Sequence, residues 1–312
     1  MTGRRLLLHS LFLFLLPVIV AWGGISVAGA IALVLLALLW RWAISLSAIA
    51  APARVPDLAL ETISASHFVE KVRWCMDRLG VAYLEQPMGG ALGAFFLGRT
   101  VPVLKFRSGA VRSSIGNSPE ILRYLWGRYA AERPEQAEFL RPTPERLEFE
   151  ARVDRCGVDL QVWVYHHILD DRDLTQHAWG ANSPRIPAWQ RLVLKLLYPL
   201  LRLLIRQAFR ITPARHAKAV QHLDALLAEV EGQLGDGRQS LLGGDTLNYT
   251  DFAFAAIMGL WAMPPQFGGG KADGVRVDID RCPEAMQNEV AGWKNTYPQT
   301  TAFIERLYEE QR

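Results

Sequence analysis

Residues 66–80 read SHFVEKVRWCMDRLG, and this stretch decides the fold. An apolar segment at 58–63 precedes it and another at 81–84 follows, so the order strand, helix, strand is predicted. Gly80 ends the helix as the residue best able to adopt a positive φ. Ser66 therefore lies at a helix N-terminus, a position that favours an anion because unpaired amides and the helix dipole point at it. The apolar positions at helical spacing are Val69, Val72, Cys75, Met76 and Leu79.

The elements that follow extend this unit to residue 130. A Gly-rich connection at 89–98 leads to a predicted strand at 101–106, an antiparallel partner at 110–113, and a helix that begins at Asn117. Pro102 starts the first of these strands, where a cis bond is common. Such a bond would leave the backbone of Val101 free to pair with an extended peptide ligand.

The N-terminal segment has a different character. No Asp, Glu, Lys or Arg occurs between Leu6 and Trp40, and about 20 apolar residues cross a bilayer. Segments 6–22 and 25–40 are joined by a Gly-Gly pair, which predicts a helical hairpin with both ends in the cytoplasm, because arginines flank both ends. The alternatives are one tilted span and a signal peptide cleaved at the small residues 28–30.

Four segments are predicted: a membrane anchor at 1–54, an α/β domain at 55–131, a linker at 132–143 and an all-α domain at 144–312. The net charge of +3 and the lack of a basic run with interleaved aromatics argue against nucleic-acid binding. The three cysteines have no metal-ligand spacing, so we expect neither a disulfide framework nor a metal site.

Two helices are predicted in the C-terminal half. The first, at 146–169, contains Trp163, Tyr165, His166 and His167; aromatic residues at this spacing are usually core, and adjacent histidines do not present both rings to one metal. The second, at 189–210, is expected to kink at a proline. It suits either an interfacial helix on anionic lipid or a core helix with a solvated basic stripe. Its basic residues are Arg191, Lys195, Arg202, Arg206 and Arg210.

These residues together resemble the glutathione S-transferase family over roughly residues 58 to 310. The similarity lies in the stretch 66–74, the Val101-Pro102 pair, the segment Asn117-Ser118-Pro119-Glu120-Ile121-Leu122 and the capping box at 247–252. The resemblance implies a thioredoxin-like N-terminal domain that binds glutathione, followed by a helical-bundle domain.

The resemblance also implies roles for individual residues. Ser66 would face the glutathione sulfur, Val101 beside Pro102 would pair with the cysteinyl backbone, and Asn117 and Ser118 would hold the γ-glutamyl end. The thiolate could then attack a hydrophobic electrophile held by the helical domain. Candidates to line that electrophile pocket are His67, Trp163, Tyr165 and His166.

The sequence departs from the family pattern at two positions. Asn117 replaces the usual acidic residue, which weakens the expected grip on an ammonium group, and no cysteine lies at the site, which argues against disulfide exchange. The expected function is thus a membrane-anchored glutathione transferase whose catalytic part faces the cytoplasm. The alternatives are an inactive glutathione-binding scaffold with the same fold and a glutathione-dependent peroxidase or isomerase. The expected partners are the electrophile and the bilayer, and the oligomeric state stays open, a homodimer included.

Overall fold

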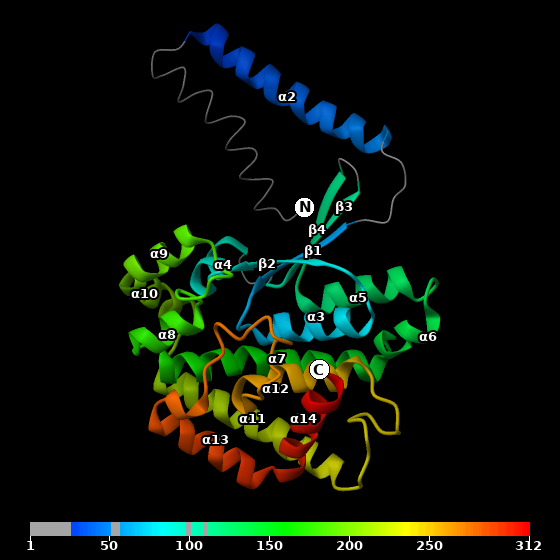
Figure 1. The fold of residues 1–312 in the computed structure, drawn as a ribbon, viewed down its shortest axis with the longest axis vertical. Helices are drawn as coiled ribbons and strands as arrows, with labels where there is room; N and C mark the ends of the chain where they lie inside the picture. The colour runs from blue at the N-terminus through cyan, green and yellow to red at the C-terminus, as the bar shows by residue number, and fades with distance from the viewer. Residues whose placement is uncertain (1–25, 51–56, 98–100, 109–110) are drawn as a thin grey trace. The chain divides into compact units, whose positions relative to one another are not determined.

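The computed structural model describes residues 26–50, 57–97, 101–108 and 111–312 (Figure 1). Residues 58–105 and 114–312 form one compact unit. Residues 1–57 and 106–113 form a second unit, whose longest described element is the helix α2 (Val27–Ala50).

The α/β part contains a four-stranded sheet in the order β2-β1-β3-β4. Strands β1 and β2 are parallel, with Ala59 opposite Leu84 and Ile63 opposite Met88. This mixed arrangement of strands and helices agrees with the predicted α/β class. The strands are β1 (Asp57–Ile63), β2 (Leu84–Met88), β3 (Val103–Ser108) and β4 (Val111–Gly116).

The start of β2 corrects the prediction of a strand at 81–84. The amide of Val81 donates to the carbonyl oxygen of Met76 at 3.1 Å, and the amide of Gly80 donates to Asp77. These bonds close the C-terminus of the preceding helix, with Gly80 at a φ of 67°. Because the amide of Val81 is bonded to the end of this helix, the strand begins only at Leu84.

Helix α3 (His67–Arg78) has the predicted position and apolar face. All five predicted apolar positions are buried, and Leu79 is its C-cap. Glu70, Lys71 and Arg73 of the same helix are also fully buried. Buried charges are tolerated only when they are paired, and each of these three is.

Helix α4 (Gly90–Leu97) occupies most of the stretch expected to be an irregular connection. Its glycines allow close packing: a Cβ on Gly90 would lie 2.6 Å from Cδ1 of Trp179. The peptide bond between Val101 and Pro102 is cis, as predicted. Helix α5 (Ser118–Tyr129) completes the α/β part.

The rest of the chain is helical, as expected for an all-α domain. The segment predicted as a linker contains α6 and a short 3-10 helix (Glu138–Leu140). The predicted capping box is present, since Asn248 and Asp251 bond each other's backbone at the start of α12. Helices α7 and α12 pack against α3 (Figure 1). The helices are α6 (Pro134–Ala137), α7 (Pro144–Ile168), α8 (Arg172–Ala178), α9 (Ala188–Leu196), α10 (Tyr198–Phe209), α11 (Pro213–Leu234), α12 (Tyr249–Ala262), α13 (Glu284–Thr296) and α14 (Pro298–Gln311).

The predicted single helix at 189–210 is two helices, α9 and α10. Pro199 has no amide to donate to the carbonyl oxygen of Lys195. The guanidinium of Arg172 donates to that oxygen instead, at 3.1 Å. The expected kink is therefore a complete break at Leu197.

The predicted membrane hairpin is only partly covered by the structure. Its first arm lies outside the described residues, and its second arm falls within α2, which continues past Trp40 to Ala50. Among the described residues, no helix meets the length and apolarity needed to cross a bilayer.

A buried ion-pair cluster joins α3 to α7. The ammonium of Lys71 lies 2.7 Å from Oε1 of Glu150 and 2.8 Å from Oδ1 of Asp154. Arg123 of α5 donates to the other oxygen of Glu150 at 2.8 Å. Burial alone would lower the pKa of Lys71, but Asp154 and Glu150 hold it above its ordinary value. Lys71 therefore stays ionised, and the cluster ties three helices together.

The last residues of the chain also contact α3. Arg312 pairs with Glu70 at 2.7 Å and with Asp77 at 2.8 Å. The indole of Trp74 donates to the carbonyl oxygen of Gln311 at 3.0 Å. Two elements distant in sequence, α7 and the last residues of the chain, thus both contact α3.

We expect Lys71→Ala to destabilise the chain by about 3–5 kcal/mol, because it leaves buried carboxylates without their cation. The control is Lys294→Ala, which removes an exposed pair with Glu305 at 3.6 Å and should cost about 0–1 kcal/mol. Chemical denaturation of the full chain measures both. Equal losses in the two variants would contradict a structural role for the cluster.

Candidate functional site

A cavity of about 990 Å³ lies within the compact unit formed by residues 58–105 and 114–312. The starts of α3 and α5 line it, and α4, α7 and α10 contribute apolar walls. Six of the residues singled out from the sequence line it: Ser66, His67, Val101, Asn117, Ser118 and Tyr165. The folded chain therefore brings together residues spread over a hundred positions.

Ser66 is the N-cap residue of α3, with φ −78° and ψ 125°. Its carbonyl oxygen accepts from the amide of Glu70 at 3.0 Å, but its side chain makes no capping hydrogen bond. Serine commonly occupies such positions because its hydroxyl caps the helix. Here the hydroxyl is left available to a ligand in the cavity.

Asn117 and Ser118, at the start of α5, also line the cavity. Asn117 adopts a φ of 68°, a conformation that asparagine tolerates better than most residues. Ser118 is 2% exposed, and its hydroxyl has no hydrogen-bond partner among the described residues. An unpaired buried hydroxyl costs about 1–3 kcal/mol, so a ligand group that bonds to it would recover that energy.

Val101 and Pro102 lie between these two helix starts in sequence. Val101 lines the cavity and is partly exposed, whereas Pro102 is buried and anchors the start of β3. The described part of the cavity wall thus carries two helix N-termini, Ser66 and Ser118, and a backbone segment at Val101. A ligand with a thiol, a peptide backbone and a carboxylate would match this set of groups.

His67 lines the cavity, but its ring makes a structural hydrogen bond. Its Nε2 lies 2.9 Å from the carbonyl oxygen of Gly157 on α7, and burial lowers the pKa of His67 to about 4. A Cβ on Gly157 would lie 2.8 Å from the ring of Phe68, so the glycine permits this approach. An imidazole with so low a pKa, held in a hydrogen bond, is a poor general base near neutral pH.

The rest of the cavity wall is mainly apolar, with charged side chains that include Asp154, Arg210 and Arg215. Tyr165 of α7 lies there, and its hydroxyl accepts from the indole of Trp179 at 3.3 Å. Burial raises the pKa of Tyr165, so the phenol stays protonated. Sequence reasoning missed most of this wall, because its members come from α4, α8 and α10 and from single positions of other helices. They include Phe68, Ala91, Val158, Trp179, Leu201, Ile205 and Phe209.

Trp163 and His166 lie elsewhere, which corrects their prediction as pocket residues. Trp163 is fully buried, and its indole donates to Glu289 at 2.5 Å. His166 stacks on His216 with ring centroids 3.9 Å apart. Neither lines the cavity, because α7 turns these two side chains toward α11 and α13 while Tyr165 faces α8 and α10.

No protein-family model and no curated protein sequence matches the chain. Solved structures with a similar arrangement include a glutathione S-transferase from Methylobacterium radiotolerans in complex with glutathione sulfonate, at 16% identity and a TM-score of 0.47. The match covers 81% of this chain and 91% of that one.

Two further structures are similar to the chain. A theta class glutathione S-transferase from Xanthomonas axonopodis pv. citri, with glutathione bound, has 21% identity and a TM-score of 0.38, covering 80% of this chain and 98% of that one. A maleylacetoacetate isomerase from Anaeromyxobacter dehalogenans has 17% identity and a TM-score of 0.38, covering 81% and 86%.

We expect the His67→Gln variant to lose less stability at acid pH than the native chain. The pKa of His67 falls from 6.5 to about 4 on folding, so below pH 6.5 the unfolded chain binds a proton that the folded chain does not. Stability is therefore lost as the pH falls from 6.5 toward 4, by about 2 kcal/mol at pH 5.

The test compares the free energy of unfolding at pH 7 and pH 5 for both proteins. Glutamine can still donate to Gly157, so most of the packing is kept. An identical pH dependence in the two proteins would show that His67 is not buried as a neutral ring.

Proposed function

We propose that this chain binds glutathione in the cavity and activates its thiol for attack on a hydrophobic electrophile. The observation that carries the proposal is the hydroxyl of Ser66, which lies at a helix N-terminus on the cavity wall and makes no capping bond. The unpaired, buried hydroxyl of Ser118 at the start of α5 supports it as a partner for the γ-glutamyl carboxylate.

The energy available at Ser66 is sufficient for the chemistry. A thiol of pKa about 8.5 is mostly protonated at neutral pH, and lowering that pKa by two units needs roughly 2.7 kcal/mol. A hydrogen bond to a charged acceptor contributes about 1.5–3 kcal/mol and a helix N-terminus about 0.3–1 kcal/mol.

In the proposed reaction the thiol first loses its proton to solvent. The thiolate sulfur then supplies the electron pair of a new sulfur–carbon bond to the electrophile, and the displaced electron pair leaves with the leaving group or is protonated by water. The apolar wall, with Tyr165 and Phe209, would hold the electrophile beside the sulfur. Bringing the two reactants together in one cavity lowers the entropic barrier to their reaction.

The second candidate is a glutathione-binding scaffold without transferase activity. It is favoured by Asn117, which is exposed and neutral where an acidic side chain would grip an ammonium group. Both candidates predict glutathione binding, and they differ in whether the bound thiol is ionised.

We expect Ser66→Ala to raise the pKa of bound glutathione by about one to two units, because the hydroxyl no longer stabilises the thiolate. An ultraviolet titration of the thiolate on the full chain, saturated with glutathione, measures this pKa. Ser113→Ala is the matched control, since Ser113 is exposed and lies outside the cavity wall.

Three outcomes separate the candidates. A lower thiol pKa in the native chain and the Ser113 variant than in the Ser66 variant supports the transferase. Binding with the same, unshifted pKa in all three proteins supports the scaffold. No calorimetric binding at millimolar glutathione would exclude both.

The proposal includes a membrane location, with the part after Arg54 in the cytoplasm. The uncharged stretch from Leu6 to Trp40 and its flanking arginines support this. Within α2 the described side chains include exposed large apolar residues, among them Val27, Ile31 and Leu36.

Helices α9 and α10 supply a second surface suited to a bilayer. Large apolar side chains are exposed along both, and the two helices contain no acidic residue. Arg202 and Arg206 pair with Asp170, whereas Lys195 and Arg210 are exposed cations beside the apolar row. Apolar side chains flanked by cations fit an anionic lipid surface. The exposed apolar residues are Trp189, Leu192, Leu196, Leu197, Leu200, Leu203 and Leu204.

We expect an environment-sensitive fluorophore on Leu200→Cys to shift to the blue when the full chain is reconstituted with vesicles containing phosphatidylglycerol. The native cysteines are buried, so labelling is selective. Because the attraction is screened by salt, the shift should fall at high ionic strength and in pure phosphatidylcholine.

The matched control is a label on Leu147→Cys, an exposed leucine of α7, which should not respond to lipid. A Leu200 signal that ignores vesicles would show that α9 and α10 do not contact the bilayer. A shift that grows with protein concentration without lipid would instead identify this surface as a contact between two copies of the chain.

A further inference from the structure

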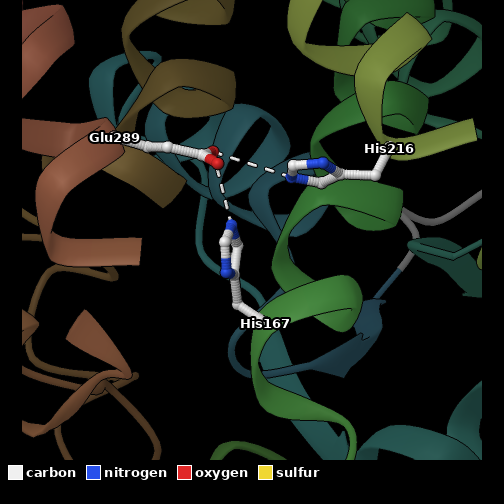
Figure 2. A group of neighbouring side chains, drawn as sticks. All are labelled: His167, His216 and Glu289. Carbon is white, nitrogen blue, oxygen red and sulfur yellow. Dashed lines mark hydrogen bonds and ion pairs between the residues drawn. The ribbon is translucent and has the colours of Figure 1, made fainter. Parts of the chain in front are cut away.

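Three side chains with metal-ligating atoms meet beside α7 (Figure 2). They are His167 of α7, His216 of α11 and Glu289 of α13. One ligand atom from each lies within 4.8 Å of the other two, and all three residues are partly buried. None of them lines the glutathione cavity.

The distances suit a common ion. Nε2 of His167 lies 3.3 Å from Oε2 of Glu289, and Nε2 of His216 lies 3.6 Å from the same oxygen. Ligands at about 2.0–2.1 Å from a tetrahedral Zn²⁺ are about 3.3–3.4 Å apart. The three atoms therefore lie near the corners of such a site and converge on one point, as Figure 2 shows.

An unsatisfied ring nitrogen of His216 indicates that the cluster can accept a further group. Its Nε2 is shielded from solvent, yet it has no hydrogen-bond partner among the described residues, since 3.6 Å to Glu289 is too long. An imidazole nitrogen in this state has its lone pair available for a cation when the ring is neutral.

Surrounding groups hold the ligands in place. The indole of Trp163 donates to Oε2 of Glu289 at 2.5 Å, and the ring of His166 stacks on His216 at 3.9 Å. The Trp163 ring also packs against His167. Such outer contacts fix the orientation of metal ligands and are a regular part of metal sites.

We propose that His167, His216 and Glu289 form a binding site for a divalent transition metal, with Zn²⁺ as the ion that fits the ligand set. Two imidazoles and one carboxylate are borderline ligands that disfavour Ca²⁺ and Mg²⁺, which take oxygen ligands. Three protein ligands leave a fourth position for water, and the partly exposed Glu289 gives access to it.

The site would tie α13 to α7 and α11. Glu289 is the only one of the three ligands on α13, and Met286, one turn earlier, lines the glutathione cavity. A bound ion therefore fixes the helix that carries part of the cavity wall. Because the ion binds the folded chain and not the unfolded one, binding raises the thermal midpoint.

The test is calorimetric titration of the full chain, stripped of metal, with ZnCl₂. We expect one ion per chain and a rise in Tm of about 5 °C at saturation. His216→Gln and Glu289→Gln each remove one ligand while keeping side-chain size, and each should weaken the affinity about 100-fold. Co²⁺ in place of Zn²⁺ should give the visible absorption of a tetrahedral ion, lost in both variants.

His222→Gln is the matched control, because His222 is on the same helix and pairs with Asp159 outside the cluster. It should keep the affinity, the Tm shift and the Co²⁺ spectrum. If the native chain binds no zinc, or if all four proteins bind it equally, the cluster is an ordinary polar contact between helices and the proposal fails. Each readout is independent of glutathione binding.

Discussion

The buried ammonium of Lys71 is the constraint on which the rest of the structure depends. It lies on α3, the helix that carries Ser66 at its start, and it pairs with Glu150 and Asp154 of α7. Asp154 is also part of the cavity wall. The same ion pairs that join the α/β part to the helical part therefore set the distance between the proposed thiol site and the apolar wall. A polar joint of this kind tolerates little displacement, because each charge must stay paired.

Much of the α/β part could be predicted because its signals are local. The apolar spacing of α3 and the positive φ of Gly80 each depend on a few neighbouring residues, as does the capping box of α12 in the helical part. The errors arise where a backbone group finds an unexpected partner. The amide of Val81 donates to Met76, so β2 begins later than predicted. The guanidinium of Arg172 donates to the carbonyl oxygen of Lys195, to which Pro199 has no amide to donate.

The candidate site likewise divides into residues whose signals are local and residues whose positions depend on packing. Ser66, Asn117 and Ser118 follow from sequence motifs, because a helix start and its first residues are contiguous. The face to which a side chain of α7 points is not local, since it depends on the helices packed around it, and this separates Tyr165 from Trp163 and His166. The cluster of His167, His216 and Glu289 could not be predicted at all, because its members are separated by 49 and 73 positions along the chain.

The contacts of the last two residues with α3 bear on the order in which the protein folds during synthesis. Glu70 is made early, yet the cation nearest to it, at 2.7 Å, is Arg312, 242 positions later in the chain. The hydrogen bond from the indole of Trp74 likewise forms only after Gln311 has been synthesised. On the ribosome, α3 and its strands must persist with only the 3.8 Å contact from Arg73 to this buried carboxylate until the final turn of α14 emerges. The α/β part is translated first but is completed last.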